Sequence, residues 1–499
     1  MSPVEPHATP QAPDDPLVRT SPPPDINTLA QLRASGWRSI PVAEELRRNA
    51  SARIAAGRPL VSGVLGFERT VLPQLENAVL AGHDVILLGE RGQAKTRLIR
   101  SLVGLLDEWI PIVAHSEIHD DPFAPISRFA RDLVAVEGDG TPIAWVHRSD
   151  RYGEKLATPD TSIADLIGEV DPIRVAEGRY LSDELTIHYG LVPRLNRGIF
   201  AVNELPDLAE RIQVGLLNVL EERDVQIRGH RVRLPLDIVL VATANPEDYT
   251  NRGRIITPLK DRFGAQIRTH YPPDAATELA IARLEANLPG SGRPGDQDAG
   301  SPATPTLVMP DFMAEIVAEL SQLARESPHL NQRSGVSVRL TIANYETLAA
   351  NAVRRALRNG ESEAVPRVSD LQSLVSSTQG KVEIETLEEG REEVLLQQLI
   401  AAAVLLVFRR RVHLEDPKAL VTAFTEETVV HAGDDLPASA YAETLSGIPA
   451  LSAPVLALAG TEDPGVVASA VELILEGLHL TKRLNKEAAG PKATYRGRG

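Results

Sequence analysis

The chain has 499 residues, of which 43% are hydrophobic and 24% are charged, so it carries enough apolar side chain for two or three globular domains. Its 52 Lys and Arg against 68 Asp and Glu give a formal net charge of −16, which argues against sequence-independent binding to nucleic acid. The absence of cysteine excludes disulfides, a cysteine nucleophile and thiolate-ligated metals, and it favours a cytoplasmic location.

The N-terminal segment is rich in proline. Its first 24 residues contain eight prolines and no apolar run, so we predict a disordered N-terminus over residues 1–35 and no secretory signal. The longest apolar run, residues 399–408, is about half of the length that a membrane span needs. We therefore expect a buried core helix there, and no membrane span.

The pattern of apolar residues divides the rest of the chain. Residues 36–271 alternate short β-branched runs (84–88, 199–202 and 238–243) with helical patterns, which predicts an α/β core with a parallel sheet. Beyond it, helical spacing predicts helices over 310–325, 340–358, 392–411 and 465–484. We expect a helical domain over 272–380 with a Gly/Pro-rich loop at 287–306, a helical region over 381–484, and a basic flexible tail over 485–499.

A phosphate-binding loop follows the first of these strands. The sequence Gly-Glu-Arg-Gly-Gln-Ala-Lys-Thr, residues 89–96, lies between a strand and a helical pattern, as a Walker A loop requires. Backbone N–H groups and the start of the helix would bind the phosphates, Lys95 would reach the β and γ oxygens, and the Thr96 hydroxyl would ligate Mg²⁺. The candidate nucleotide-binding residues are Gly89, Arg91, Gly92, Gln93, Ala94, Lys95, Thr96 and Arg97.

One position of this loop departs from the motif. Ala94 stands where glycine usually precedes the lysine. Alanine is acceptable there if its φ angle is negative at the start of the helix, and this is what we expect.

Polar residues end the next two apolar strands. Asn203 and Glu204 follow the strand 199–202 at the place of a Walker B pair, so Glu204 is the candidate base for the attacking water. Asn203 replaces the usual acid as a metal ligand, and we expect weaker Mg²⁺ affinity or slower turnover. Asn245 ends the strand that follows and could bind the water or the γ-phosphate. Arg262 could act as an arginine finger, although alone it would be assigned to a surface salt bridge.

With these segments in order, the chain resembles the AAA+ ATPases, and within them the magnesium-chelatase I-subunit and MoxR-like clade. The resemblance lies in residues 119–123 (HDDPF), 190–198 (GLVPRLNRG), 242–248 (ATANPED) and 337–339 (SVR), and it spans roughly residues 60–360. It implies an AAA+ core with helix-2 and pre-sensor 1 insertions near 165–198 and 225–238, followed by a helical lid.

The same resemblance implies roles and partners. It makes Asn245 the sensor 1 residue, Arg262 a finger acting on a neighbouring subunit and Arg339 the sensor 2 contact to the nucleotide. It also implies a homo-oligomeric ring, a hexamer, that uses ATP and Mg²⁺ and works on a von Willebrand A-domain protein. The expected function is an ATPase that remodels or activates a partner protein.

Two alternatives stay open. A nucleotide-dependent assembly scaffold or switch with little turnover is favoured by Asn203 and Ala94, whereas a σ54-type activator is disfavoured because its GAFTGA loop is absent.

His115, Glu117, His119 and Asp121 alternate as metal ligands would along a strand, but Pro122 follows them. A polar loop is the preferred interpretation of that segment.

Overall fold

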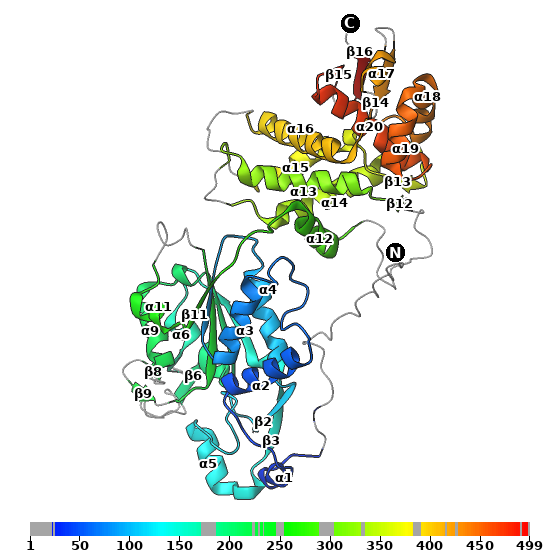
Figure 1. Ribbon diagram of the computed structural model, residues 1–499. Helices are drawn as coiled ribbons and strands as arrows, with labels where there is room; N and C mark the ends of the chain where they lie inside the picture. Colours follow the sequence, from blue (N-terminus) through cyan, green and yellow to red (C-terminus); the bar gives the residue numbers. More distant parts are fainter. Residues whose placement is uncertain are drawn as a thin grey trace. The chain divides into compact units, whose positions relative to one another are not determined.

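The computed structural model forms two compact units, Met1–His270 and Tyr271–Gly499. The predicted end of the α/β core at residue 271 coincides with the boundary between them. Figure 1 shows the sheet of the first unit with helices on both of its faces, and the second unit as a stack of helices with a small sheet. The structure describes residues 22, 25–170, 186–221, 225–227, 230–232, 234–245, 254–288, 304–330, 335–382, 391–414, 417–424, 428–489 and 492–497.

The first unit is built on a five-stranded sheet of order β11-β1-β10-β7-β4. Every neighbouring pair in it is parallel, so the carboxyl ends of all strands meet at one edge. The three strands predicted from the sequence are confirmed as β1, β7 and β10, and two further strands flank them. The strands are β1 (Val85–Leu88), β4 (Tyr152–Leu156), β7 (Gly198–Asn203), β10 (Ile238–Ala244) and β11 (Ala265–Arg268).

Both faces of this sheet are buried. Alternate strand residues enter separate cores, with Leu87 and Ala201 on one face and Ile86 and Phe200 on the other. This explains why the strands read as continuous apolar runs. The helices of the unit are α1 (Leu29–Ala34), α2 (Val42–Ala55), α3 (Val71–Ala81), α4 (Lys95–Ser101), α5 (Arg128–Glu137), α6 (Ile163–Leu166), α8 (Leu191–Arg194), α9 (Glu210–Glu221) and α11 (Thr257–Arg262).

Helix α1 corrects the prediction of disorder over residues 1–35. Thr28 caps this helix in a capping box with Gln31, and Leu29 and Leu32 are fully buried. The sequence analysis missed this short apolar segment because it directly follows the proline-rich residues. Residues 1–21 lie outside the described ranges.

Three small antiparallel pairs complete the first unit. They are β2 (Trp109–Val113) with β3 (Ile143–His147), β5 (Gly168–Val170) with β6 (Ile187–Tyr189), and β8 (Val225–Ile227) with β9 (His230–Val232). The last pair confirms the hairpin predicted for the pre-sensor 1 insertion. Residues 171–185 of the other predicted insertion lie outside the described residues.

The second unit is mainly helical, and its four predicted helices are confirmed as α13, α14, α16 and α20. The larger of its hydrophobic cores extends from Leu279 to Tyr495 and crosses residue 380, where we expected a boundary. Strands β12 (Thr306–Leu307) and β13 (Glu363–Ala364) pair beside α14. The helices are α12 (Ala275–Glu285), α13 (Asp311–Glu326), α14 (Val338–Asn359), α15 (Leu374–Thr378), α16 (Arg391–Arg411), α17 (Pro417–Thr422), α18 (Tyr441–Gly447), α19 (Ser452–Ala459) and α20 (Pro464–Leu480).

The predicted flexible tail is wrong. Strands β15 (Leu484–Ala489) and β16 (Lys492–Gly497) pair antiparallel, and β14 (Val429–Ala432) adds to β16. Tyr495 is only 2% exposed, and its hydroxyl donates a hydrogen bond to the Glu476 carboxylate at 2.5 Å. Two basic residues of the tail, Lys492 and Arg496, occupy exposed positions of β16 and obscured its strand pattern.

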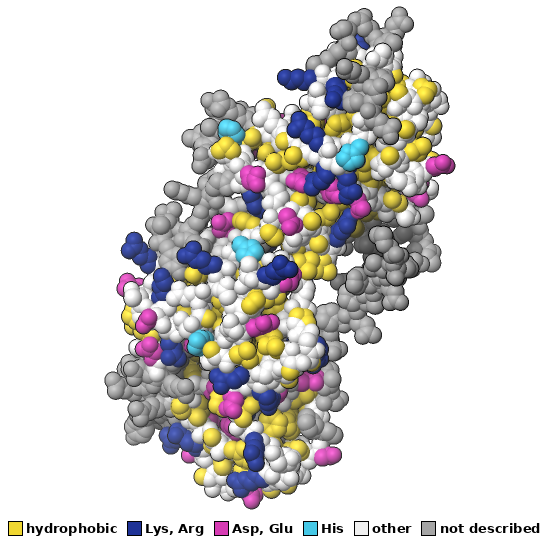
Figure 2. Space-filling model, viewed as in Figure 1, with side chains coloured by type: hydrophobic (Ala, Val, Ile, Leu, Met, Phe, Trp, Pro, Cys, Tyr) yellow, Lys and Arg dark blue, Asp and Glu magenta, His cyan; other side chains and the backbone are white. Residues whose placement is uncertain are grey.

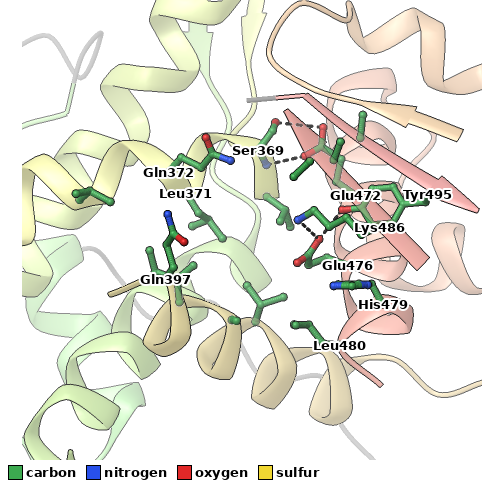
Figure 3. A pocket seen from close by; sticks show the side chains of 18 of the residues that line it. Ser369, Leu371, Gln372, Gln397, Glu472, Glu476, His479, Leu480, Lys486 and Tyr495 are labelled. Atoms are coloured by element: carbon green, nitrogen blue, oxygen red, sulfur yellow. Dashed lines mark hydrogen bonds and ion pairs between the residues drawn. The ribbon is translucent and has the colours of Figure 1, made fainter. Parts of the chain in front are cut away.

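These strands close one side of a pocket of about 620 Å³ in the second unit, lined also by α16 and α20 (Figure 3). Its carboxylates are already engaged. Glu476 accepts from Lys486 at 2.7 Å, and Glu472 accepts from the Ser369 N–H at 2.7 Å. Burial raises the pKa of Glu472. These groups tie the C-terminal strands and residues 368–373 to α20.

The surface carries mixed charge. On the face in Figure 2, Lys and Arg side chains are interspersed with Asp and Glu. Within the described ranges, no single helix is long and apolar enough to cross a membrane, and only the bent pair 438–447 and 449–459 meets length and composition limits together.

The C-terminal strands yield a test of stability. We expect Tyr495→Ala to lower the free energy of unfolding by about 3–5 kcal/mol, because it empties a buried aromatic site and removes the hydrogen bond to Glu476. Arg496→Ala, at the exposed neighbouring position, is the control and should change it by less than about 0.5 kcal/mol. Denaturant unfolding measures the free energy of unfolding of both variants. If the two substitutions lower it equally, the tail is flexible, as the sequence predicted.

Candidate nucleotide-binding site

The predicted phosphate-binding loop lies at the carboxyl edge of the sheet, between the end of β1 and the start of α4. The Gly89 N–H donates to Ala244 O at 3.1 Å, and the Thr269 N–H donates to Leu88 O at 2.8 Å, so the strands on both sides of β1 anchor the loop. A Cβ atom on Gly89 would lie 1.9 Å from Thr269 Oγ1 and 2.3 Å from Gln93 Oε1. Only glycine fits there.

Two side chains fill the interior of the loop. Gln93 Oε1 accepts from the Glu90 N–H at 3.1 Å and from Thr269 Oγ1 at 2.7 Å. Lys95 Nζ donates to Gly89 O at 2.5 Å and to Glu90 O at 2.8 Å. The loop therefore curls around a buried ammonium group at the N-terminus of a helix, an arrangement suited to phosphate.

The other loop candidates lie around this centre. Gly92 has a φ angle of 77°, which favours glycine, and Thr96 is half-buried in the first turn of α4. Arg91 and Arg97 are exposed, and the Arg97 guanidinium packs over Gly63. These two cations could reach a bound anion only from the rim of the loop.

The expectation of a negative φ angle at Ala94 is wrong. Ala94 adopts a left-handed conformation, with φ 52° and ψ 15°, immediately before α4. This backbone costs an alanine about 1–2 kcal/mol, and the hydrogen bonds that anchor the loop maintain it.

The Walker B candidates end β7 and are tied to β10. The Glu204 N–H donates to Thr243 Oγ1 at 3.0 Å, and Thr243 Oγ1 donates to Asn203 Oδ1 at 3.3 Å. Glu204 is also left-handed, with a φ angle of 54°. This places Asn203, Glu204 and the buried Asn245, which directly follows β10, at the same edge of the sheet as the loop.

A carboxylate that sequence analysis missed contacts Asn203. Asn203 Nδ2 donates to Glu154 Oε1 at 2.5 Å, and Arg100 and Tyr152 donate to Glu154 Oε2 at 2.8 and 3.0 Å. Burial raises the pKa of Glu154, but the hydrogen bonds from Arg100, Tyr152 and Asn203 outweigh it, so that the pKa lies below its ordinary value. The only signal in the sequence was the missing acid at position 203, which calls for a compensating charge nearby.

The two arginine candidates lie elsewhere. Arg262 Nε is 3.6 Å from Asp84 Oδ2, at the amino end of β1, whereas the loop follows its carboxyl end. Four strand residues separate these positions, about 13 Å, so Arg262 is far from its own loop. Arg339 is exposed in the first turn of α14, in the second unit, and its role as sensor 2 stays a prediction.

The donor set fits a magnesium nucleotide. A hydroxyl (Thr96), an amide oxygen (Asn203) and a carboxylate (Glu204) are the hard oxygen donors that Mg²⁺ prefers. A single direct ligand such as Thr96 suffices when phosphates and water complete the shell. The residues present could therefore hold Mg²⁺ together with a nucleotide.

The polar loop predicted at His115–Asp121 is confirmed, because the segment forms turns rather than a strand. Asp120 is fully buried and accepts from the Ile126 and Ser127 N–H groups at 2.7 and 2.8 Å. Burial, followed by the positive charge of Arg151, lowers the pKa of His119 to about 4. His119 is therefore a neutral residue of the folded loop.

The fold and this arrangement agree with the predicted AAA+ type of core: a parallel sheet of this order, a phosphate loop after β1, and polar residues after its neighbours. The chain is similar to magnesium-chelatase subunits. The 38 kDa subunit of Rhodobacter capsulatus is 28% identical over 256 residues, which cover 48% of this chain and 64% of that protein. ChlI of Nostoc sp. is 27% identical over 233 residues, which cover 46% and 58%.

These relatives confirm the predicted resemblance to magnesium-chelatase I subunits. The chain spans less than two thirds of the length of either one. No known family model matches it. Among solved structures, a chain in a complex between subunits BchI and BchD of magnesium chelatase aligns at 23% identity over 68% of this chain and all of that chain, with a TM-score of 0.33.

His119 predicts an acid-labile contribution to stability. The pKa of His119 is about 4 in the folded chain, against an ordinary value of 6.5 in the unfolded chain. Between these values the unfolded chain binds more protons, so the free energy of unfolding falls as the pH drops through this window. The loss approaches about 3 kcal/mol near pH 4. His119→Asn keeps a residue that tolerates its φ angle of 51° and should flatten this slope.

His115→Asn is the matched control, because His115 is exposed and also left-handed, with a φ angle of 64°. Unfolding free energies measured between pH 4 and 7 compare the two variants with wild type. If His119→Asn and wild type lose stability in parallel, His119 is not the group responsible.

Proposed function

We propose that this chain binds Mg²⁺ and ATP and hydrolyses ATP as a subunit of a ring, a hexamer, that remodels or activates a partner protein. The observation that carries the proposal is the convergence of the Lys95 loop, Glu204 and Asn245 at one edge of the sheet. Lys95 would bind the β and γ phosphates, Thr96 the metal, and Glu204 would accept the proton of the attacking water.

The position of Arg262 supports the ring. It pairs with Asp84 at the opposite end of β1 from the loop, where it could meet the nucleotide of a neighbouring subunit but not its own. Removing an arginine finger lowers turnover by about 10³-fold or more. Arg339 would then complete the site from the lid as sensor 2.

The proposed partner is a von Willebrand A-domain protein. Resemblance to the magnesium-chelatase and MoxR-like clade supports a von Willebrand A-domain protein, and the β8–β9 hairpin offers an insertion through which a ring could contact it. We also expect a cytoplasmic location, which rests on composition alone.

Mixing two inactive variants tests the shared site. We expect Lys95→Ala and Arg262→Ala each to abolish ATP hydrolysis, because one removes phosphate binding and the other the finger. An equimolar mixture should recover up to about a quarter of wild-type activity, since one interface in four pairs an intact loop with an intact finger. Steady-state phosphate release over a protein concentration series measures this.

Lys260→Ala, an exposed change in the same helix as Arg262, is the control and should retain activity. An active Arg262→Ala variant, or a mixture that stays inactive, would contradict a finger acting between subunits.

A scaffold or switch with little turnover is the second candidate, and Asn203 in place of an acid favours it. Comparison of wild type with Glu204→Gln separates the two. The ATPase proposal requires wild type to be at least about 100-fold faster, as expected when a general base is lost. Equal rates, with nucleotide binding intact, would establish the switch.

A further inference from the structure

The Asn203 side chain is held on both sides. Its Nδ2 donates to Glu154 Oε1 at 2.5 Å, and its Oδ1 accepts from Thr243 Oγ1 at 3.3 Å. A carboxylate can only accept, so the Glu154 contact fixes which end of the amide is nitrogen. Oδ1, the atom that could face a metal or its water, is therefore directed away from β4 by Glu154.

Glu154 also faces the helix that follows the phosphate loop. In the parallel register Glu154 pairs with Ala201 and Leu156 pairs with Asn203, so Glu154, Ala201 and Asn203 share one face of the sheet. Ala201 on that face packs in the same core as Ile99 of α4. Arg100, which binds Glu154, lies four residues after Thr96 and thus on the same side of α4.

The positive charge of Arg100 does not fully cancel the negative charge of Glu154 for a cation bound at the candidate magnesium site. The Arg100 side chain is 64% exposed and the Glu154 side chain 20%. Water and salt screen the guanidinium more than the carboxylate. A negative charge is therefore retained one side-chain contact away from the position where the Walker B acid would lie.

We propose that Glu154 is a positioning residue of the magnesium site, which orients the Asn203 amide and supplies the negative charge that position 203 lacks. This inference rests on the proposed binding of Mg²⁺ and nucleotide. In this proposal β4 supplies the negative charge that the Walker B motif places at the end of β7. An aspartate at position 203 should therefore improve Mg²⁺ binding only when Glu154 is replaced by a neutral residue.

Binding of a fluorescent ATP analogue, titrated with Mg²⁺ and repeated in EDTA, tests the proposal without measuring turnover. We expect Glu154→Gln to raise the Mg²⁺ concentration for half-maximal binding about tenfold, as for other groups that support a metal ligand, with binding in EDTA unchanged. The double variant Glu154→Gln/Asn203→Asp should restore the wild-type value, because it returns the charge to the end of β7.

Arg100→Gln is the matched control, because it breaks the same ion pair but leaves the carboxylate. We expect its Mg²⁺ requirement to be equal to that of wild type or lower. If Arg100→Gln and Glu154→Gln weaken Mg²⁺-dependent binding equally, the pair only holds β4 to α4 and the proposal is overturned. A double variant no better than Glu154→Gln would overturn it as well.

Thermal unfolding without nucleotide supplies a second readout. Asn203→Asp alone places two carboxylates in contact and should lower Tm, and adding Glu154→Gln should restore it. An unchanged Tm for Asn203→Asp would overturn the contact on which the proposal stands. If the wild type binds no nucleotide, the proposed function is overturned. If the wild type and Glu154→Gln both bind Mg²⁺-nucleotide with the same Mg²⁺ requirement, only this inference is overturned.

Discussion

The candidate site depends on one buried ion pair that sets the position of the edge strand β4. Arg151, 1% exposed, binds both carboxylate oxygens of Glu45 at 2.6 and 2.8 Å and donates twice to Arg197 O, just before β7. Breaking such a pair by removing one partner costs about 3–5 kcal/mol. The backbone segments at Arg151 and Gly198 approach so closely that a Cβ atom on Gly198 would lie 2.0 Å from Arg151 O. Glu154 reaches Asn203 because this contact fixes the register three residues earlier.

From that register, hydrogen bonds between neighbouring strands assemble the rest of the edge. Thr243 of β10 bonds to both Asn203 and Glu204, Thr269 after β11 bonds to Gln93, and the Ala244 carbonyl receives the Gly89 N–H. Apart from Gln93 in the phosphate loop, each partner lies within one residue of the end of its strand. The strained left-handed residues Ala94 and Glu204 occur where the chain leaves this network, which holds them in place.

The sequence was sufficient to predict what is local or strongly periodic. The loop 89–96, the buried strands and the helices α13, α14, α16 and α20 were located because their patterns span many residues with one environment. The edge strand β4, YGEKL, is mostly half-exposed and has no apolar period, so it and Glu154 were missed. The φ angle of Ala94 depends on a loop anchored by residues distant in sequence, so that prediction failed, whereas β15 and β16 were missed because charged residues interrupt their apolar pattern.

The pairing of Asn203 with Glu154 bears on how a departure from a motif should be interpreted. Two unit charges interact by about 4 kcal/mol at 4 Å and by about 2.4 kcal/mol at 7 Å for an effective dielectric constant of 20, so a carboxylate moved back by one side chain keeps more than half of its attraction for a cation. The loss expected from Asn203 alone is therefore partly offset by a residue on a different strand. A polar residue at the motif position, oriented by a fixed charge behind it, keeps part of the electrostatic field at the edge of the sheet even though the motif is incomplete. The contact with Glu154 therefore weakens the argument for a switch that Asn203 alone would provide.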